Sequence, residues 1–102
     1  MVVIMAISSI LDLRIKPESL DTAPDVLRAT LVATREFPGC LGVTVLVDSA
    51  DPAHVVLYET WDSIDSDRAY RAWRQTPEGA SQLGTVLAGP PALVLYTVAD
   101  DI

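Results

Sequence analysis

A carboxylate in the middle of an apolar, aromatic run is the first feature of this sequence that could carry chemistry. Glu59 follows Tyr58 and precedes Trp61 in the run that starts at Val55. A carboxylate buried alone is costly, so it must find a partner or change its affinity for a proton. Glu59 could therefore act as a base that removes a phenolic proton, or it could form a structural ion pair or hydrogen bond with an arginine or a backbone N–H.

Aromatic side chains gather around this carboxylate in the sequence. Trp61 follows Glu59 by two residues, so both side chains point to the same face of a strand. Tyr70 and Trp73 are three residues apart, which puts them on one face of a helix that follows the strand. Large rigid rings can stack on a flat aromatic ligand or pack into the core, and the residues alone leave both interpretations open.

Three arginines and two isolated reactive side chains complete the candidates. Arg68, Arg71 and Arg74 repeat every three residues and could attract an anionic substrate, but we expect them to form a solvated helix face. Cys40 is expected to be a small buried hydrophobe. His54, the only histidine, is expected to be a surface turn residue. The sequence contains no hydrolase triad, phosphate-binding glycine loop or metal-ligand spacing.

The elements that must position these residues follow from the apolar periodicity and the turn residues. Pro38-Gly39 ends the first helix, and the cluster of Ser and Asp after Trp61 starts the second. The predicted strands cover residues 2–15, 40–48, 54–61 and 92–98, and the predicted helices cover residues 24–37, 62–76 and 80–87. This order predicts one α+β domain over residues 1–102, with a ferredoxin-like βαββαβ fold and a four-stranded antiparallel sheet with helices on one face.

Composition limits the possible partners. Half of the 102 residues are hydrophobic, so the chain is expected to fold. The net charge of −7, with only seven basic residues, argues against binding to nucleic acid or to an anionic membrane surface. The apolar segment from Met1 to Leu11 lacks a basic start and a cleavage signature, so we interpret it as a strand. The single cysteine fits a reducing, cytoplasmic location.

The strands also predict an assembly. Residues 43–47 and 55–57 are apolar on both alternating faces, whereas a sheet covered by helices on one side should be polar on the other. An apolar second face needs a partner, and a twofold homodimer that packs sheet against sheet is the simplest arrangement.

Several short motifs resemble the antibiotic biosynthesis monooxygenase (ABM) family. The motifs are Arg35-Glu36-Phe37-Pro38-Gly39-Cys40-Leu41, the Asp-Ser-Ala-Asp-Pro turn after a Val-rich strand, Tyr58-Glu59-Thr60-Trp61-Asp62-Ser63, and Trp73-Arg74-Gln75-Thr76-Pro77. The resemblance implies a dimeric α+β barrel with a pocket between sheet and helices in each protomer. It also implies a cofactor-independent oxidation of a small aromatic or polyketide-like phenol or hydroquinone with O2.

Two departures from the family pattern affect the expected site. Trp73 stands where members usually have a histidine. The haem-degrading branch of the family also uses an asparagine on strand one, but this chain has no asparagine and offers Ser8 or Ser9 there. Haem ligation is therefore not expected, and no cofactor or metal is predicted. The resemblance implies that Trp61 and Trp73 hold the ring, with Tyr70 and Ser8 as further contacts, while Glu59 or Tyr58 handles the proton. The alternatives are a non-catalytic ligand-binding or regulatory dimer, and a polyketide cyclase or aromatase.

Overall fold

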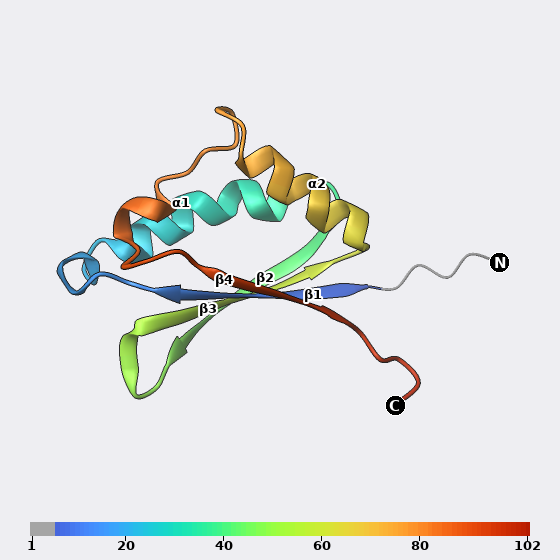
Figure 1. The fold of residues 1–102 in the computed structure, drawn as a ribbon, viewed down its shortest axis with the longest axis horizontal. Helices are drawn as coiled ribbons and strands as arrows, with labels where there is room; N and C mark the ends of the chain where they lie inside the picture. The colour runs from blue at the N-terminus through green and yellow to red at the C-terminus, as the bar shows by residue number, and fades with distance from the viewer. Residues whose placement is uncertain (1–5) are drawn as a thin grey trace.

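A four-stranded antiparallel sheet carries both α-helices on one face in the computed structural model, which describes residues 6–102 (Figure 1). The strand order across the sheet is β2-β3-β1-β4. The elements in chain order are β1 (Ile7–Arg14), η1 (Pro17–Ser19), α1 (Ala23–Glu36), β2 (Cys40–Asp48), β3 (Asp51–Trp61), α2 (Ile64–Arg74), η2 (Leu83–Val86) and β4 (Ala92–Thr97). The predicted ferredoxin-like α+β fold is confirmed.

Local signals set the ends of the two long helices. Pro24 lies in the first turn of α1, and the residue after α1, Phe37, is extended because Pro38 follows it. Gly39 then adopts φ 92°, a left-handed conformation that favours glycine. At the start of α2, the Ser63 hydroxyl accepts a hydrogen bond from the Ser66 N–H and caps the helix.

The register of β1 against β3 decides which side chains face the helices. Ser9 pairs with Glu59, and the neighbouring pairs Leu11↔Leu57 and Leu13↔Val55 lie on the same face. Leu13, Leu57 and Val55 are buried in the core with residues of α1 and η2. Ser9 and Glu59 therefore lie on the helix-covered face, inside the layer where the core packs.

Three predicted segments differ from the structure. The predicted helix over residues 80–87 is the short 3-10 helix η2 (Leu83–Val86), because a segment between Gly79 and Gly89 that also contains Gly84 is too short and too flexible for an α-helix. Strand β1 ends at Arg14, and the predicted strand over residues 2–5 lies outside the described residues. Strand β3 begins at Asp51 rather than at residue 54, so only residues 49–50 separate it from β2.

The prediction that His54 is a surface turn residue is therefore wrong. His54 lies within β3, where its Nε2 is 2.9 Å from Asp12 Oδ2 on β1 and its Nδ1 is 2.9 Å from Asp48 Oδ2 on β2. These hydrogen bonds, first to Asp12 and then to Asp48, raise the pKa of His54. The bond to His54 also lowers the pKa of Asp48.

A pH dependence of stability follows from this cluster. Because the pKa of His54 is higher in the folded state than in the unfolded state, its stabilising effect is complete below the unfolded value, about 6.5. The effect is lost as the pH rises through the folded-state pKa. Thermal unfolding should therefore show the largest difference between wild type and His54→Gln near pH 6 and a smaller difference near pH 8.5. A difference that grows between these two pH values would contradict the assignment.

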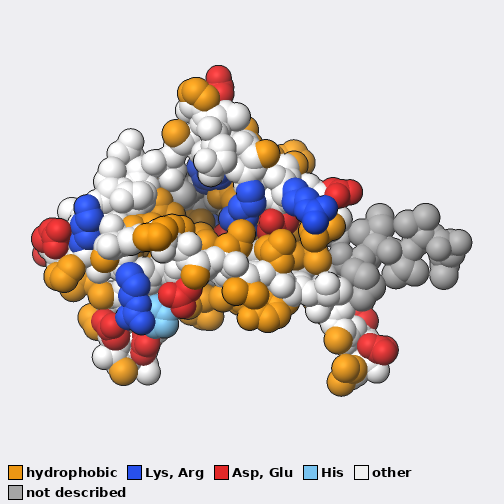
Figure 2. All heavy atoms as spheres, in the orientation of Figure 1, with side chains coloured by type: hydrophobic (Ala, Val, Ile, Leu, Met, Phe, Trp, Pro, Cys, Tyr) orange, Lys and Arg blue, Asp and Glu red, His pale blue; other side chains and the backbone are white. Residues whose placement is uncertain are grey.

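Hydrophobic side chains are exposed along the sheet layer (Figure 2). On the sheet face opposite the helices, the register places Leu46, Tyr58, Val94 and Tyr96, which are 49%, 41%, 48% and 52% exposed. The apolar second face expected from the sequence is therefore present. No helix among residues 6–102 is long and apolar enough to cross a bilayer.

Candidate functional site

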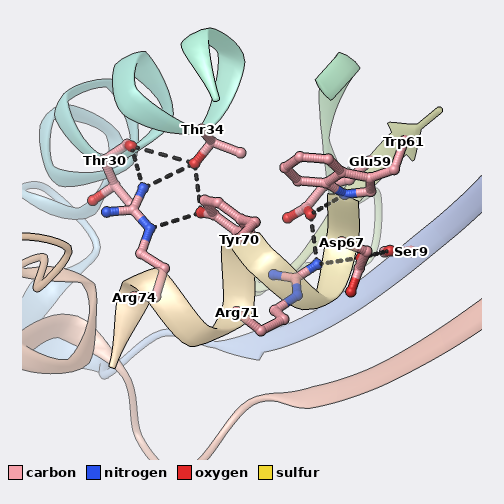
Figure 3. Close-up of polar contacts among 9 residues, drawn as sticks. All are labelled: Ser9, Thr30, Thr34, Glu59, Trp61, Asp67, Tyr70, Arg71 and Arg74. Atoms are coloured by element: carbon pink, nitrogen blue, oxygen red, sulfur yellow. Dashed lines mark hydrogen bonds and ion pairs between the residues drawn. The ribbon is translucent and has the colours of Figure 1, made fainter. Parts of the chain in front are cut away.

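Glu59 is buried at the centre of an ion-pair network on the helix-covered face of the sheet (Figure 3). Its side chain is 1% exposed. Glu59 Oε1 accepts two hydrogen bonds, one from Trp61 Nε1 at 3.1 Å and one from Arg71 Nη2 at 2.6 Å. The ion pair with an arginine, one of the two interpretations of Glu59, is thus present.

A second buried carboxylate shares the same arginine. Arg71 Nη2 also donates to Asp67 Oδ2 at 3.2 Å, and the Ser9 hydroxyl donates to that oxygen. Asp67 is 1% exposed and Ser9 is fully buried. Burial opposes the charge of Arg71, but the carboxylates of Glu59 and Asp67 outweigh it and raise the pKa of the guanidinium above its ordinary value. Arg71 is therefore a permanent cation held between β3 and α2.

The network leaves polar atoms unused. Both hydrogen bonds to Glu59 end on Oε1, so Oε2 has no protein donor among residues 6–102. Both hydrogen bonds from Arg71 start at Nη2. Its Nε is buried without a partner, and within the same described range Nη1 donates to no protein acceptor. One carboxylate oxygen and one guanidinium nitrogen are thus available to a ligand.

A cavity of about 400 Å³ lies against this network, between the sheet, α2 and the segment around η2. Glu59, Arg71 and Tyr70 belong to its wall. Most of the rest is apolar: Leu11, Leu31, Leu57, Leu83, Leu87, Pro91 and Leu93. The volume lies in the range of small-molecule sites, and an apolar wall with a few convergent polar groups is typical of them.

Arg74 ties α2 to α1 and to the following loop. Its Nε donates to the Tyr70 hydroxyl at 2.7 Å, its Nη1 to the Gly79 carbonyl at 3.1 Å, and its Nη2 to the Thr30 carbonyl at 2.8 Å and Thr34 Oγ1 at 2.9 Å. All of these partners are neutral. Arg74 therefore holds the helix layer together and fixes the hydroxyl of Tyr70, which also hydrogen-bonds to Thr34 at 2.6 Å.

The expectation that the arginines of α2 form a solvated face is wrong for two of the three. Arg68 is exposed, but Arg71 and Arg74 turn inward. The physical reason is that buried acceptors reach them from other elements: Glu59 on β3 for Arg71, and Thr30 and Thr34 on α1 for Arg74.

Aromatic rings form a separate cluster beside the cavity. Trp61 is fully buried, with its ring centroid 5.0 Å from Tyr70 and 6.2 Å from Phe37. Trp73 lies 5.5 Å from Phe37. Trp61 does not line the cavity that holds Glu59, but its indole N–H orients the carboxylate. Trp73 lines a different hollow of about 420 Å³ along α1.

Comparison with known proteins agrees with this architecture. The sequence profile of the antibiotic biosynthesis monooxygenase family matches residues 6–80, which is most of the chain. The chain belongs to this family. No curated protein gives a significant match.

Solved structures of ABM proteins share the fold. One crystal structure of an antibiotic biosynthesis monooxygenase is 24% identical, with a TM-score of 0.77 over 91% of this chain and 98% of that one. A Nitrosomonas europaea protein named for the same family is 17% identical, with a TM-score of 0.79 over 98% and 96%. A conserved protein from Methanosarcina mazei Go1 is 18% identical, with a TM-score of 0.75 over 91% and 92%. At these identities the likeness establishes the fold.

The structure divides the site residues suggested by the ABM resemblance into two groups. Glu59 and Tyr70 line the cavity, and Trp61 contacts Glu59 from the core. Tyr58 is 41% exposed on the opposite face of the sheet, where its hydroxyl is 3.4 Å from Ser8 Oγ. Tyr58 and Ser8 thus lie away from the cavity.

The residue on strand one that faces the site is Ser9, which alternates with Ser8. Asp67 was not among the candidate residues from the sequence, and Arg71 was expected on a solvated helix face. Their four-residue spacing on a helix was the available signal, because such pairs are neighbours. No group of three or more potential ligands able to hold a metal ion occurs in the described part of this ABM chain.

Proposed function

We propose that this chain is a cofactor-independent monooxygenase that oxidises a small aromatic or polyketide-like phenol or hydroquinone with O2. The observation that carries the proposal is the position of Glu59, a buried carboxylate with one unused oxygen in the wall of an apolar cavity of about 400 Å³. Membership of the ABM family supports the reaction class. The apolar wall suits an aromatic ring, and the carboxylate suits its hydroxyl group.

Glu59 and Arg71 have separate roles in the proposed reaction, proton transfer and charge stabilisation. Glu59 Oε2 accepts the proton of the phenol, and the phenolate that results is electron-rich enough to reduce O2. Arg71 stays charged and offsets the negative charge that develops on the ring oxygen. In the complete reaction a ring carbon and the phenolic hydroxyl each lose one hydrogen, and both positions become carbonyls. One atom of O2 becomes the new carbonyl oxygen on the ring carbon, and the other atom leaves as water with the two hydrogens.

The experiment that tests this proposal follows O2 uptake across a panel of phenols, hydroquinones and anthrones, with isotopically labelled O2 and mass spectrometry of the products. The proposal expects one labelled oxygen in the product and one molecule of O2 consumed per product. Binding of panel members without O2 uptake would overturn it in favour of a non-catalytic ligand-binding dimer. Product formation at equal rates without O2 would overturn it in favour of a cyclase.

We propose that two copies pack through the sheet faces that lie opposite the helices. The supporting observation is the exposure of Leu46, Tyr58, Val94 and Tyr96 on that face. Exposed apolar patches of this kind mark association surfaces on soluble proteins. A stable interface buries about 800 Å² on each partner, which a four-stranded sheet face can supply.

A charge placed on the sheet face should dissociate the dimer. The variant Leu46→Asp/Val94→Asp is expected to elute as a monomer in size exclusion with light scattering, whereas wild type elutes as a dimer. The matched control is Val32→Asp on α1, where a 56% exposed valine lies outside the proposed interface. Equal masses for wild type and the double variant, with both folded, would contradict the sheet-to-sheet arrangement.

We propose a cytoplasmic location for the chain. Cys40 is the only cysteine and is free. Burial raises the pKa of its thiol, with hydrogen bonding at Gly42 acting in the opposite direction, so Cys40 is a weak nucleophile. A protein without disulfides and with an unreactive thiol suits a reducing compartment.

A further inference from the structure

We infer that the cavity takes an aromatic ring with two hydroxyl groups on adjacent carbons, a catechol-type substrate bound by Glu59 Oε2 and Arg71 Nη1. The inference rests on the proposed function, since it names the substrate class for the same site. It starts from two of the atoms that the network leaves without a partner among residues 6–102, one an acceptor only and the other a donor only.

The two free atoms belong to a single ion pair. Glu59 Oε1 and Arg71 Nη2 are 2.6 Å apart, so Oε2 and Nη1 are the outer ends of the joined carboxylate and guanidinium. In Figure 3 both free ends point away from Asp67 and Ser9. Both side chains line the same cavity. A ligand at this position therefore meets an acceptor and a donor side by side.

Adjacent hydroxyls satisfy both protein atoms at once. The first hydroxyl donates to Glu59 Oε2, and the oxygen of the second accepts from Arg71 Nη1. The second hydroxyl keeps its proton and donates it to the first oxygen, which stabilises the phenolate once Glu59 has taken the proton. A single phenol leaves Nη1 without an acceptor, and leaving a buried polar group unpaired costs affinity.

Charge argues against a carboxylate as the bound group. Glu59 and Asp67, both 1% exposed, share the guanidinium of Arg71, so these three side chains together carry an excess of negative charge. The other cavity arginine, Arg74, donates to neutral groups of α1, Tyr70 and the loop. A ligand carboxylate at Nη1 would lie next to the free oxygen of Glu59 and be repelled. A neutral diphenol avoids this repulsion.

Oxidation of such a substrate balances with O2 alone. A ring carbon of the diphenol that carries hydrogen becomes a carbonyl with one oxygen atom from O2, and the other oxygen atom leaves as water. The two hydroxyl groups lose one hydrogen in total, so the product is a hydroxyquinone. Glu59 carries the proton only in transit and is returned to its carboxylate form.

The test measures binding under nitrogen, where no oxidation can occur, by quenching of tryptophan fluorescence with a metal chelator present. Three ligands are compared: naphthol, the naphthalenediol with adjacent hydroxyls, and the isomer with its hydroxyls on opposite rings. Wild type is expected to bind the adjacent diol about tenfold more tightly than the other two. Equal affinity for all three ligands, or no binding of any, would overturn the inference.

The variant Arg71→Lys tests the contact between Arg71 Nη1 and the second hydroxyl of the ligand. Lysine keeps the positive charge between Glu59 and Asp67, but it has one nitrogen and cannot supply both Nη2 and Nη1. We expect the preference for the adjacent diol over naphthol to fall to about twofold or less. The matched control is Arg68→Lys on the exposed face of the same helix, which should keep the full preference. A preference that survives Arg71→Lys in a folded protein would overturn the inference.

Failure of the inference and failure of the proposed function are distinguishable. Tight binding of the adjacent diol without O2 uptake would support the recognition and contradict the oxidation. O2 uptake with single phenols, together with no preference for adjacent hydroxyls, would contradict the recognition and support the oxidation.

Discussion

Replacing Arg71 with methionine should lower the free energy of unfolding by about 3 to 5 kcal/mol. Methionine fills a similar volume but removes the one cation among residues 6–102 that pairs with the buried carboxylates of Glu59 and Asp67. Both carboxylates are 1% exposed, so water does not fully replace the lost partner. Urea unfolding followed by tryptophan fluorescence measures the change, at one fixed protein concentration because association would also contribute to stability.

Two further variants distinguish the loss of the Arg71 charge, which compensates the buried carboxylates, from the loss of side-chain packing. Arg68→Met, on the exposed side of the same helix, should change the free energy of unfolding by no more than about 0.5 kcal/mol. Adding Glu59→Gln and Asp67→Asn to Arg71→Met removes the buried charges and should recover most of the lost stability. If Arg71→Met loses as little free energy of unfolding as Arg68→Met, the ion pair contributes little to the stability of the fold.

The second large effect is expected on catalysis. Glu59→Gln should reduce kcat on an active phenol by about 10²- to 10⁴-fold, the usual contribution of a positioned general base. The glutamine oxygen can still accept hydrogen bonds from Trp61 and Arg71, so the cavity keeps its shape. Glutamine cannot take up the phenolic proton, however. Ligand affinity measured under nitrogen should therefore change far less than kcat.

Glu78→Gln is the control for this substitution, because Glu78 is exposed and does not line the cavity around Glu59. Its kcat should equal that of wild type. Wild-type kcat in a folded Glu59→Gln variant would remove Glu59 from the mechanism and leave it as a structural partner of Arg71. If Glu59→Gln does lower kcat, stopped-flow mixing of the wild-type complex with O2 can show whether proton transfer or the reaction with O2 limits the rate.

Much of the fold could be predicted because its signals are local. The alternation around Val55 and Leu57, the helical spacing before Phe37 and the Pro-Gly stop at residues 38–39 each act within a few residues. They fixed the order of elements, and with it the ferredoxin-like topology. The alternation also placed Glu59 and Trp61 on one face, which the structure confirms. Only the glycine-rich segment before β4 was assigned the wrong kind of helix.

The site itself depended on contacts that no local pattern contains. Arg68, Arg71 and Arg74 look alike in the sequence, yet one is exposed and two turn inward. Arg71 does so because the fold brings β3 against α2 and supplies the carboxylate of Glu59.

The orientation of Ser8 and Ser9 also depends on a contact between distant segments. Alternation could not say which of Ser8 and Ser9 faces the helices until the register of β1 against β3 was known. The sequence alone determined the fold, the family and the buried carboxylate at residue 59. The tertiary structure decided which side chains meet that carboxylate. A charge can stay buried only where distant segments bring compensating groups to it, and those groups are set by packing rather than by spacing along the chain.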